Sequence, residues 1–365
     1  MNRATVGNIV EALIKNGVVM ELPVLQMNAR PAGRPPIGLK LNPAAGCFIG
    51  VDMYDCRLTA VLTDFECHPV VEHLASFRRN ASANVILKTV QQAVCALLEQ
   101  SGKHKKKLGG IGLSLPGRIN LKTGVTVEYY RIPHWQNIPF AESLSTTFKT
   151  PVFVEHNSST VALAEAWNNH PQASGVVASI LIRTGVSFGI VQNREIINSG
   201  TYSAGELGHT VINFQGPLCR CGRKGCLETY VSGAALARIT EEKASENPGW
   251  PGAKALQNSF DADLICGLAE SGDPISRDIL RTMFRHLCIG LDTIMCLYAP
   301  DIITIDGIFN KAAHLLHEAI EMHCMPSLLI NTKICIAHYD NKTGAVGAAL
   351  LAASRVCNPL HHLLQ

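Results

Sequence analysis

One short run of metal-ligand residues constrains this chain more than any other feature of its 365 residues. His209 is followed by Cys219, Cys221 and Cys226, at gaps of ten, two and five residues. One histidine and three cysteines fill the four positions of a tetrahedral Zn²⁺ site, so no position is left open for a substrate. The spacing therefore predicts a structural zinc site around which this part of the chain has to fold.

Glycines and carboxylates surround the four predicted ligands. Gly222 and Gly225 lie between the second and the last cysteine, where they allow the backbone to turn tightly around an ion. Glu206 and Glu228 frame the block, and a closed zinc site does not need them as ligands. A rigid metal knuckle flanked by free carboxylates predicts a small-molecule pocket that the zinc helps to shape.

A disulfide within the block is the alternative, but Cys-x-Cys neighbours are too strained to bridge each other easily. The other members of the 13 cysteines are scattered singly through apolar runs, which is typical of small buried hydrophobes. No secretory leader pattern opens the chain. The apolar stretch 279–298 is broken by charged residues, which disfavours a membrane span. We expect a cytoplasmic protein with reduced thiols and no membrane partner.

The first 42 residues predict a partial winged helix-turn-helix. Residues 3–16 follow the helical i, i+3, i+4 apolar pattern and end at Gly17. Strands are expected at 18–25 and 37–41, joined by a basic turn rich in glycine and proline. Helix, strand, basic turn and strand form the recognition helix and wing of such a domain. The residues expected to contact DNA are Arg3, Thr5, Asn8, Arg30 and Arg34.

Three observations qualify this prediction. Residues 1–40 carry a net charge of +3 while the rest of the chain is balanced, which favours nucleic acid only weakly. An amphipathic helix followed by a hairpin shows the same pattern without any DNA contact. A helix-turn-helix also needs an earlier helix for the recognition helix to pack on. We therefore consider a misassigned start, a remnant head, or a head that docks elsewhere.

The body alternates strands with helices, which predicts α/β layers with polar groups gathered at strand ends. Helices are expected at 83–101 and 276–298 and from 344 onward. The expected strands are 47–53, 58–64, 108–115, 152–154, 176–182, 188–192, 302–305 and 333–337.

These motifs together resemble the ROK family (repressors, open reading frames and sugar kinases), and the basic head resembles its transcriptional-repressor branch. The zinc block is the most specific match, and the likeness covers almost the whole chain. Weaker matches support it: the Asp52 hairpin, Pro116-Gly117, Trp135 with Pro139-Phe140, Glu155-His156-Asn157, and the small-residue run Gly344–Ala349.

The resemblance implies two actin-like (RNase H-like) α/β lobes with a hexose cleft between them, preceded by the partial winged helix. The first lobe would contain 46–157 and 344–357. The second would contain 158–343, with the zinc knuckle at 206–228.

The resemblance also assigns residues to sites. His209, Cys219, Cys221 and Cys226 match the family's zinc ligands. His156, Asn157, Glu206, His209 and Glu228 match positions that shape the sugar site. Asn157 stands where the kinases carry the aspartate that takes a proton from the sugar hydroxyl, and an amide cannot serve as a general base.

The nucleotide side departs further from the kinases. Asp52-Met53-Tyr54-Asp55-Cys56-Arg57 lacks both glycines of the first phosphate loop, and Asp55 would repel phosphate. Phe188 stands in the second loop, and Asp306-Gly307-Ile308 keeps only one glycine of the adenosine loop. Arg131, at a position where the kinases often show asparagine, either binds an acidic sugar or points to solvent.

These losses predict that the protein is not an enzyme. We expect a homodimeric, sugar-responsive DNA-binding regulator, a repressor, with operator DNA and a small sugar or sugar derivative as partners and structural Zn²⁺ as cofactor. The alternatives are an ATP-dependent sugar kinase of the family and a truncated regulator that has lost DNA binding.

Overall fold

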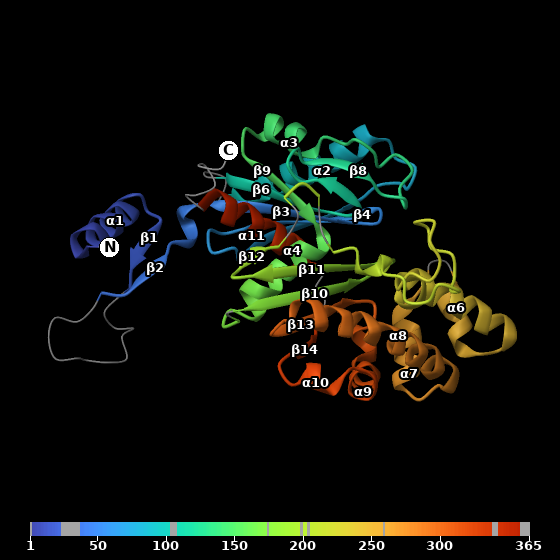
Figure 1. Cartoon of the computed structure of the whole chain (residues 1–365). Coiled ribbons are helices and arrows are strands. Elements are labelled where there is room, and N and C mark those ends of the chain that lie inside the picture. The colour runs from blue at the N-terminus through green and yellow to red at the C-terminus, as the bar shows by residue number, and fades with distance from the viewer. Residues whose placement is uncertain are drawn as a thin grey trace. The chain divides into compact units, whose positions relative to one another are not determined.

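The computed structural model describes residues 2–22, 37–102, 108–173, 175–197, 200–202, 205–257, 260–337 and 342–357 (Figure 1). The chain divides into two compact units. The first contains residues up to 116, 123–155 and those from 348 onward. The second contains 117–122 and 156–347.

The first unit is built on a five-stranded sheet in the order β5-β4-β3-β6-β9. The central strand β3 is buried along its first seven residues and pairs antiparallel with β4 and parallel with β6. Its helices are α2 (Ala83–Gln100), α3 (Phe140–Phe148) and most of α11 (Thr343–Cys357). The strands are β3 (Cys47–Tyr54), β4 (Arg57–Thr63), β5 (Pro69–Ser76), β6 (Leu108–Leu115) and β9 (Val152–His156), with a short β8 (Val125–Glu128) outside the sheet.

The second unit repeats this strand order as β12-β11-β10-β13-β14. In both sheets the first strand in sequence is central. On one side the second strand pairs antiparallel with it, and the third pairs antiparallel with the second. On the other side the fourth strand pairs parallel with the central strand. The strands are β10 (Val176–Ile182), β11 (Val186–Gln192), β12 (Glu195–Ile196), β13 (Ile302–Gly307) and β14 (Lys333–Ile336), and a short β7 (Arg118–Asn120) belongs to the same unit.

Helices cover the second sheet and enclose its apolar core. Helix α8 is the longest, and its start is fixed by Pro274 in the first turn and by Asp273, whose carboxylate accepts from the Ser276 N–H at 2.8 Å. It buries Phe284, Leu287 and Leu291 against the strands and neighbouring helices. The helices are α4 (Asn157–Ala164), continuing as the π-helix η4 (Glu165–Asn169), α5 (Glu228–Val231), α6 (Gly233–Glu246), α7 (Ala262–Glu270), α8 (Pro274–Tyr298), α9 (Ala313–His323) and α10 (Pro326–Leu329).

The α/β prediction is confirmed, and the periodic segments lie within a few residues of their predicted bounds. The predicted helix 83–101 is α2, which buries Ile86, Val90 and Leu97 at helical spacing. Strand β5 and helix α3 were not predicted. β5 is an edge strand with no fully buried residue, so its sequence carries a weak apolar signal.

The head is a helix and a two-stranded hairpin. Helix α1 (Arg3–Lys15) is capped by Asn2, whose side chain accepts from the Ala4 N–H at 3.1 Å. Strands β1 (Val19–Glu21) and β2 (Leu39–Leu41) pair antiparallel and are shorter than predicted within the described residues. The predicted turn between them, with Arg30 and Arg34, lies outside the described residues.

Within the described residues, no helix combines the length and the apolar character that a membrane span requires. Charged side chains interrupt even the 25-residue helix α8.

Candidate metal centre and ligand site

The four predicted metal ligands lie in one loop of the second unit. The short 3₁₀ turn η5 (Leu207–His209) presents His209, and the chain then folds into a small hairpin whose residue pairs are Val211 with Cys226 and Leu218 with Lys224. Gly225 has φ +71°, and a Cβ there would lie 1.5 Å from the Asn213 carbonyl oxygen. Only glycine permits this turn, which brings the last cysteine back to the histidine.

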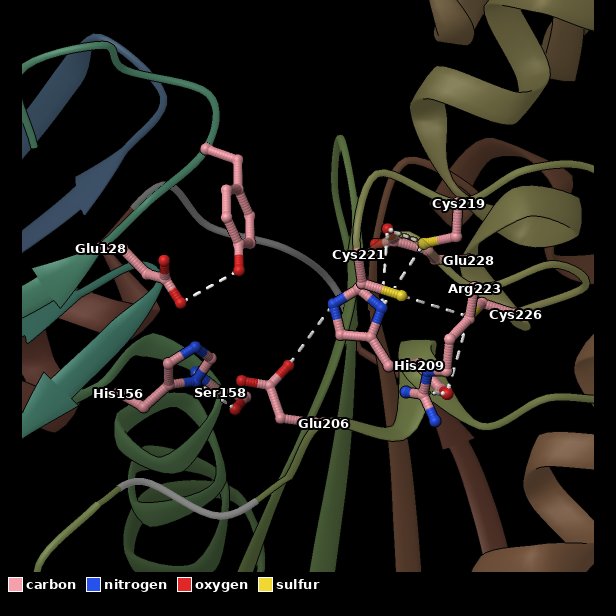
Figure 2. Close-up of polar contacts among 11 residues, drawn as sticks. Glu128, His156, Ser158, Glu206, His209, Cys219, Cys221, Arg223, Cys226 and Glu228 are labelled. Carbon is pink, nitrogen blue, oxygen red and sulfur yellow. Dashed lines mark hydrogen bonds and ion pairs between the residues drawn. The ribbon is translucent and has the colours of Figure 1, made fainter.

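The ligand atoms of His209, Cys219, Cys221 and Cys226 all lie within 4.8 Å of one another (Figure 2). The Cys219 Sγ and His209 Nδ1 atoms are 3.6 Å apart, and the Cys221 and Cys226 sulfur atoms are 3.7 Å apart. A tetrahedral zinc ion with bonds of about 2.3 Å to sulfur and about 2.0 Å to nitrogen separates its ligand atoms by roughly 3.5–3.8 Å. The four side chains therefore fit a tetrahedral metal ion at its ordinary bond lengths.

Arg223 lowers the pKa of one of the thiols and so favours the form that binds metal. Burial of the Cys221 thiol opposes its ionisation, but the backbone N–H and the guanidinium of Arg223 hydrogen-bond the sulfur and lower the pKa of Cys221 to about 6. The same guanidinium donates to the His209 carbonyl oxygen at 2.8 Å. Burial and the neighbouring Glu228 carboxylate instead raise the pKa of Cys219. The lowered pKa favours the thiolate form of Cys221, and a metal ion would displace the protons of the other thiols.

Two carboxylates flank the histidine ring on opposite sides. Glu206 Oε2 lies 3.8 Å from His209 Nε2, and the Glu206 side chain is 53% exposed. Glu228 Oε1 lies 3.9 Å from His209 Nδ1 and accepts from the Cys219 thiol at 3.3 Å. Because Nδ1 faces the sulfur atoms, Nε2 faces Glu206, as Figure 2 shows. A metal on Nδ1 would leave Nε2 as a donor toward Glu206.

The predicted sugar residues His156 and Asn157 lie where β9 passes into α4. His156 Nδ1 lies 2.8 Å from Ser158 Oγ, and that hydroxyl also hydrogen-bonds the Phe188 carbonyl at 2.9 Å. The Asn157 side chain is buried, and among the described residues nothing hydrogen-bonds its Oδ1 atom. A buried carbonyl oxygen of this kind is suited to accept from a ligand hydroxyl.

Sequence reasoning did not identify Ser158 or Arg223 as functional residues. Ser158 fixes the His156 ring, and the only sequence signal was a hydroxyl two residues after a histidine at a helix start. Arg223 holds both Cys221 and the His209 backbone, and its signal was a basic residue inside a cysteine cluster.

Comparison with known proteins identifies the family. The model of the ROK family matches residues 48–355. The chain belongs to the ROK family. A glucokinase of Halalkalibacterium halodurans is 31% identical over 69% of this chain and 78% of its own length.

Regulators of the family match a larger share of the chain. A xylose repressor of Caldicellulosiruptor bescii is 24% identical over 97% of this chain and 89% of its own length. The crystal structure of a ROK family transcriptional regulator, a homologue of the E. coli Mlc protein, matches with a TM-score of 0.82. It covers 98% of this chain and 89% of that one at 23% identity. This structural likeness shows that the two chains share a fold.

The segment that resembles the first phosphate loop of ROK kinases is a tight turn between β3 and β4. Asp55 has φ +51° at this turn, and both of its carboxylate oxygens accept from Arg79 Nη2 at 3.1 Å. Arg79 Nη1 donates to the Arg131 carbonyl oxygen at 3.3 Å. The turn therefore has Asp55, paired with Arg79 from the segment after β5, where the kinase motif has two glycines.

Phe188 does not lie in a loop. Strand β11 starts at Val186, two residues before the predicted strand, so Phe188 is inside the strand with its side chain in the core. Its ring lies 5.6 Å from that of Tyr298. Its carbonyl accepts from the Ser158 hydroxyl, and its N–H donates to the Gly205 carbonyl, each at 2.9 Å. The turn before β11 is only Arg183–Gly185, and Arg183 is buried. Phe188 was expected both in the second phosphate loop and at the start of the strand 188–192, and only the strand position is confirmed, because the antiparallel pairing with β10 extends to Val186.

Two of the predicted DNA-contacting residues, Thr5 and Asn8, are exposed on α1. Arg3 begins that helix, and its side chain lies outside the described part of the chain, as do Arg30 and Arg34. Val6, Ile9 and Leu13 also remain exposed on α1, at 45%, 46% and 36%.

Proposed function

We propose that this protein is a sugar-responsive DNA-binding transcriptional regulator, a repressor, whose kinase-like body binds a sugar or sugar derivative without transferring phosphate. This proposal rests on the share of the chain that each relative matches. The glucokinase match covers 69% of the chain, whereas the xylose repressor match covers 97%. A match over 97% of the chain must extend into the head with α1 and the β1–β2 hairpin, which precedes the start of the family model at residue 48.

Zn²⁺ is the metal that best fits the candidate centre, held by His209, Cys219, Cys221 and Cys226. Thiolate and imidazole ligands at tetrahedral spacing favour zinc over calcium or magnesium, which prefer oxygen. With all four positions taken by protein, the ion would supply folding energy and fix the His209 ring. The ring would then hold its Nε2 atom toward Glu206.

The effector site would use polar groups of the second unit. Glu206, Glu228, His156 and His209 offer acceptors and donors in fixed directions, as recognition of a polyol requires. The Asn157 carbonyl oxygen, which no described donor satisfies, would accept from a sugar hydroxyl. Effector binding would change the affinity of the heads for operator DNA through a coupling free energy.

DNA binding tests the regulator proposal directly. The full-length chain should select a sequence from a pool of random duplexes and bind it in a gel shift that weakens steeply with salt. Thr5→Ala and Asn8→Ala should each weaken that binding by about 10–100-fold, since a base contact contributes about 1–3 kcal/mol. Thr146→Ala, at an exposed threonine of α3, is the matched control and should bind like the wild type. Failure of the full chain to select any sequence would support the alternative of a regulator that has lost DNA binding.

The glucokinase match makes a sugar kinase the second candidate, and an ATP-consumption assay separates the two. We expect no turnover with hexoses or amino sugars, because Asn157 cannot accept the hydroxyl proton and Asp55 occupies the phosphate turn. Asn157→Asp should not restore turnover, since the loop glycines are also missing. Hexose-dependent ATP consumption by the wild type, above that of a blank and measured beside the H. halodurans glucokinase, would reject the proposal.

A further inference from the structure

The hairpin that carries the candidate metal ligands exposes two large apolar side chains. Phe214 is 86% exposed, more than any other large hydrophobic residue in the described part of the chain, and Leu218 is 71% exposed. Both lie within residues 213–224, which we call the hairpin tip. Single apolar side chains are common on protein surfaces, but two on one short tip form a candidate interaction surface.

A tight turn holds Phe214 in its exposed position. The Asn213 carbonyl accepts from the Gly216 N–H at 2.9 Å, and the Asn213 side chain accepts from the Gln215 N–H at 3.0 Å. A Cβ on Gly216 would lie 2.0 Å from the Tyr230 hydroxyl oxygen, so the turn packs closely against α5. A segment that is held in place before binding loses less conformational entropy when a partner covers it.

The charged side chains of the hairpin tip are all cations. Arg220, Arg223 and Lys224 lie in the stretch 211–227, which contains no aspartate or glutamate. The Arg223 guanidinium is used within the hairpin, where it donates to the His209 carbonyl at 2.8 Å (Figure 2). Arg220 and Lys224 are exposed and can reach a partner. The hairpin tip therefore combines apolar side chains with positive charge and carries no acid.

We propose that the hairpin tip binds an acidic segment of a partner protein. Phe214 and Leu218 would enter an apolar pocket, and Arg220 and Lys224 would face carboxylates at its rim. An apolar centre surrounded by polar contacts is the usual anatomy of a protein interface. Charge complementarity selects the partner, because two cations without an acid beside them repel a basic surface and attract an acidic one.

Other anionic partners use only part of this surface. Duplex DNA would pair its phosphates with Arg220 and Lys224 but would leave Phe214 and Leu218 in water. An anionic bilayer would accept the two apolar side chains, but even a single myristoyl chain, which buries more apolar surface, binds membranes only marginally. An acidic protein segment satisfies the apolar and the cationic side chains together.

A random peptide library displayed on phage tests the proposal, with the immobilised full-length chain as the target. The selected peptides should share an apolar residue flanked by aspartate or glutamate. A synthetic peptide of that consensus should bind the wild type in a calorimetric titration, more weakly as salt rises. Phe214→Ser and, separately, Leu218→Ser should each weaken this binding by roughly 10–100-fold, because one large apolar side chain is no longer buried. Arg220→Glu combined with Lys224→Glu should weaken it by roughly tenfold or more, since like charges then face each other.

Matched controls separate the hairpin tip from general effects. Leu74→Ser removes a 63% exposed leucine of β5, and Lys88→Glu combined with Lys122→Glu changes the net charge by the same amount as the charge-reversed tip. Both controls should bind the peptide like the wild type. A peptide with lysine in place of its carboxylates should bind the charge-reversed tip better than it binds the wild type. A merely structural role of the two cations would not produce this rescue.

Circular dichroism and metal content should match the wild type in every variant, since the altered side chains are exposed. A library that yields no acidic consensus would overturn the proposal, and so would a peptide whose binding does not depend on Phe214. Binding to phosphatidylserine vesicles or to a single-stranded oligonucleotide that Phe214→Ser abolishes would overturn it in favour of those partners. The experiment uses neither operator DNA nor sugar, so its failure leaves the regulator proposal standing.

Discussion

Replacing Cys219 or Cys226 with serine should remove the metal and unfold the loop between Glu206 and Glu228. We expect the purified wild type to contain about one zinc per chain, since the four ligand atoms fit one tetrahedral ion. Structural zinc in small domains contributes an apparent binding free energy of about 10–16 kcal/mol, so its loss should exceed the effect of any surface substitution. Metal analysis together with thermal unfolding measures both consequences.

Cys95→Ser is the matched control for the serine variants. Cys95 is an exposed cysteine of α2, far in sequence from the block, and its replacement should change neither zinc content nor unfolding temperature. A chelator that strips the wild type should reproduce the unfolding of the Cys219 variant. A wild type that is stable and free of metal would contradict the structural-zinc proposal.

Gly112→Ala should destabilise the first unit by about 3 kcal/mol or more, at or beyond the upper end of ordinary overpacking. Gly112 lies on β6 beneath α11, and a Cβ there would lie 1.7 Å from the Ala348 carbonyl oxygen and 2.5 Å from its carbon. Neither atom belongs to a flexible side chain, so α11 would have to move away from the sheet. Denaturant unfolding monitored by circular dichroism would detect the loss.

Gly267→Ala adds the same methyl group but should have the opposite effect on stability. Gly267 lies inside α7, and a Cβ there would meet no atom within 4 Å. Alanine has the higher helix propensity, so this substitution should stabilise the protein by up to about 1 kcal/mol. Equal effects of the two substitutions would show that α11 does not pack on β6 as closely as described.

The proposed regulator differs from a kinase at particular atoms. Asp55, paired with Arg79, lies in the turn that resembles the phosphate loop of ROK kinases, and Asn157 offers an amide where those kinases have a base. The candidate effector site keeps polar groups beside a metal centre. A polar site without those kinase groups is what the proposed sensor requires.

Patterns that are local in sequence could be predicted well. The helical apolar pattern gave α2 and α8, and the Cys₃His spacing indicated the metal centre, because both depend on residues close along the chain. Edge strand β5 was missed because it has no fully buried residue, and the start of β11 was predicted two residues late because strand pairing with β10 extends to Val186.

The sequence by itself therefore determined the cluster of one histidine and three cysteines, the α/β class and the amide at Asn157, since residue type and short spacing are sufficient for these. Only the tertiary structure decided which groups meet across long separations. It paired Asp55 with Arg79, attached Ser158 to the Phe188 carbonyl and gave both sheets the same strand order. Such contacts arise from the packing of whole elements, and that packing follows from the combined burial of their apolar faces rather than from any local pattern.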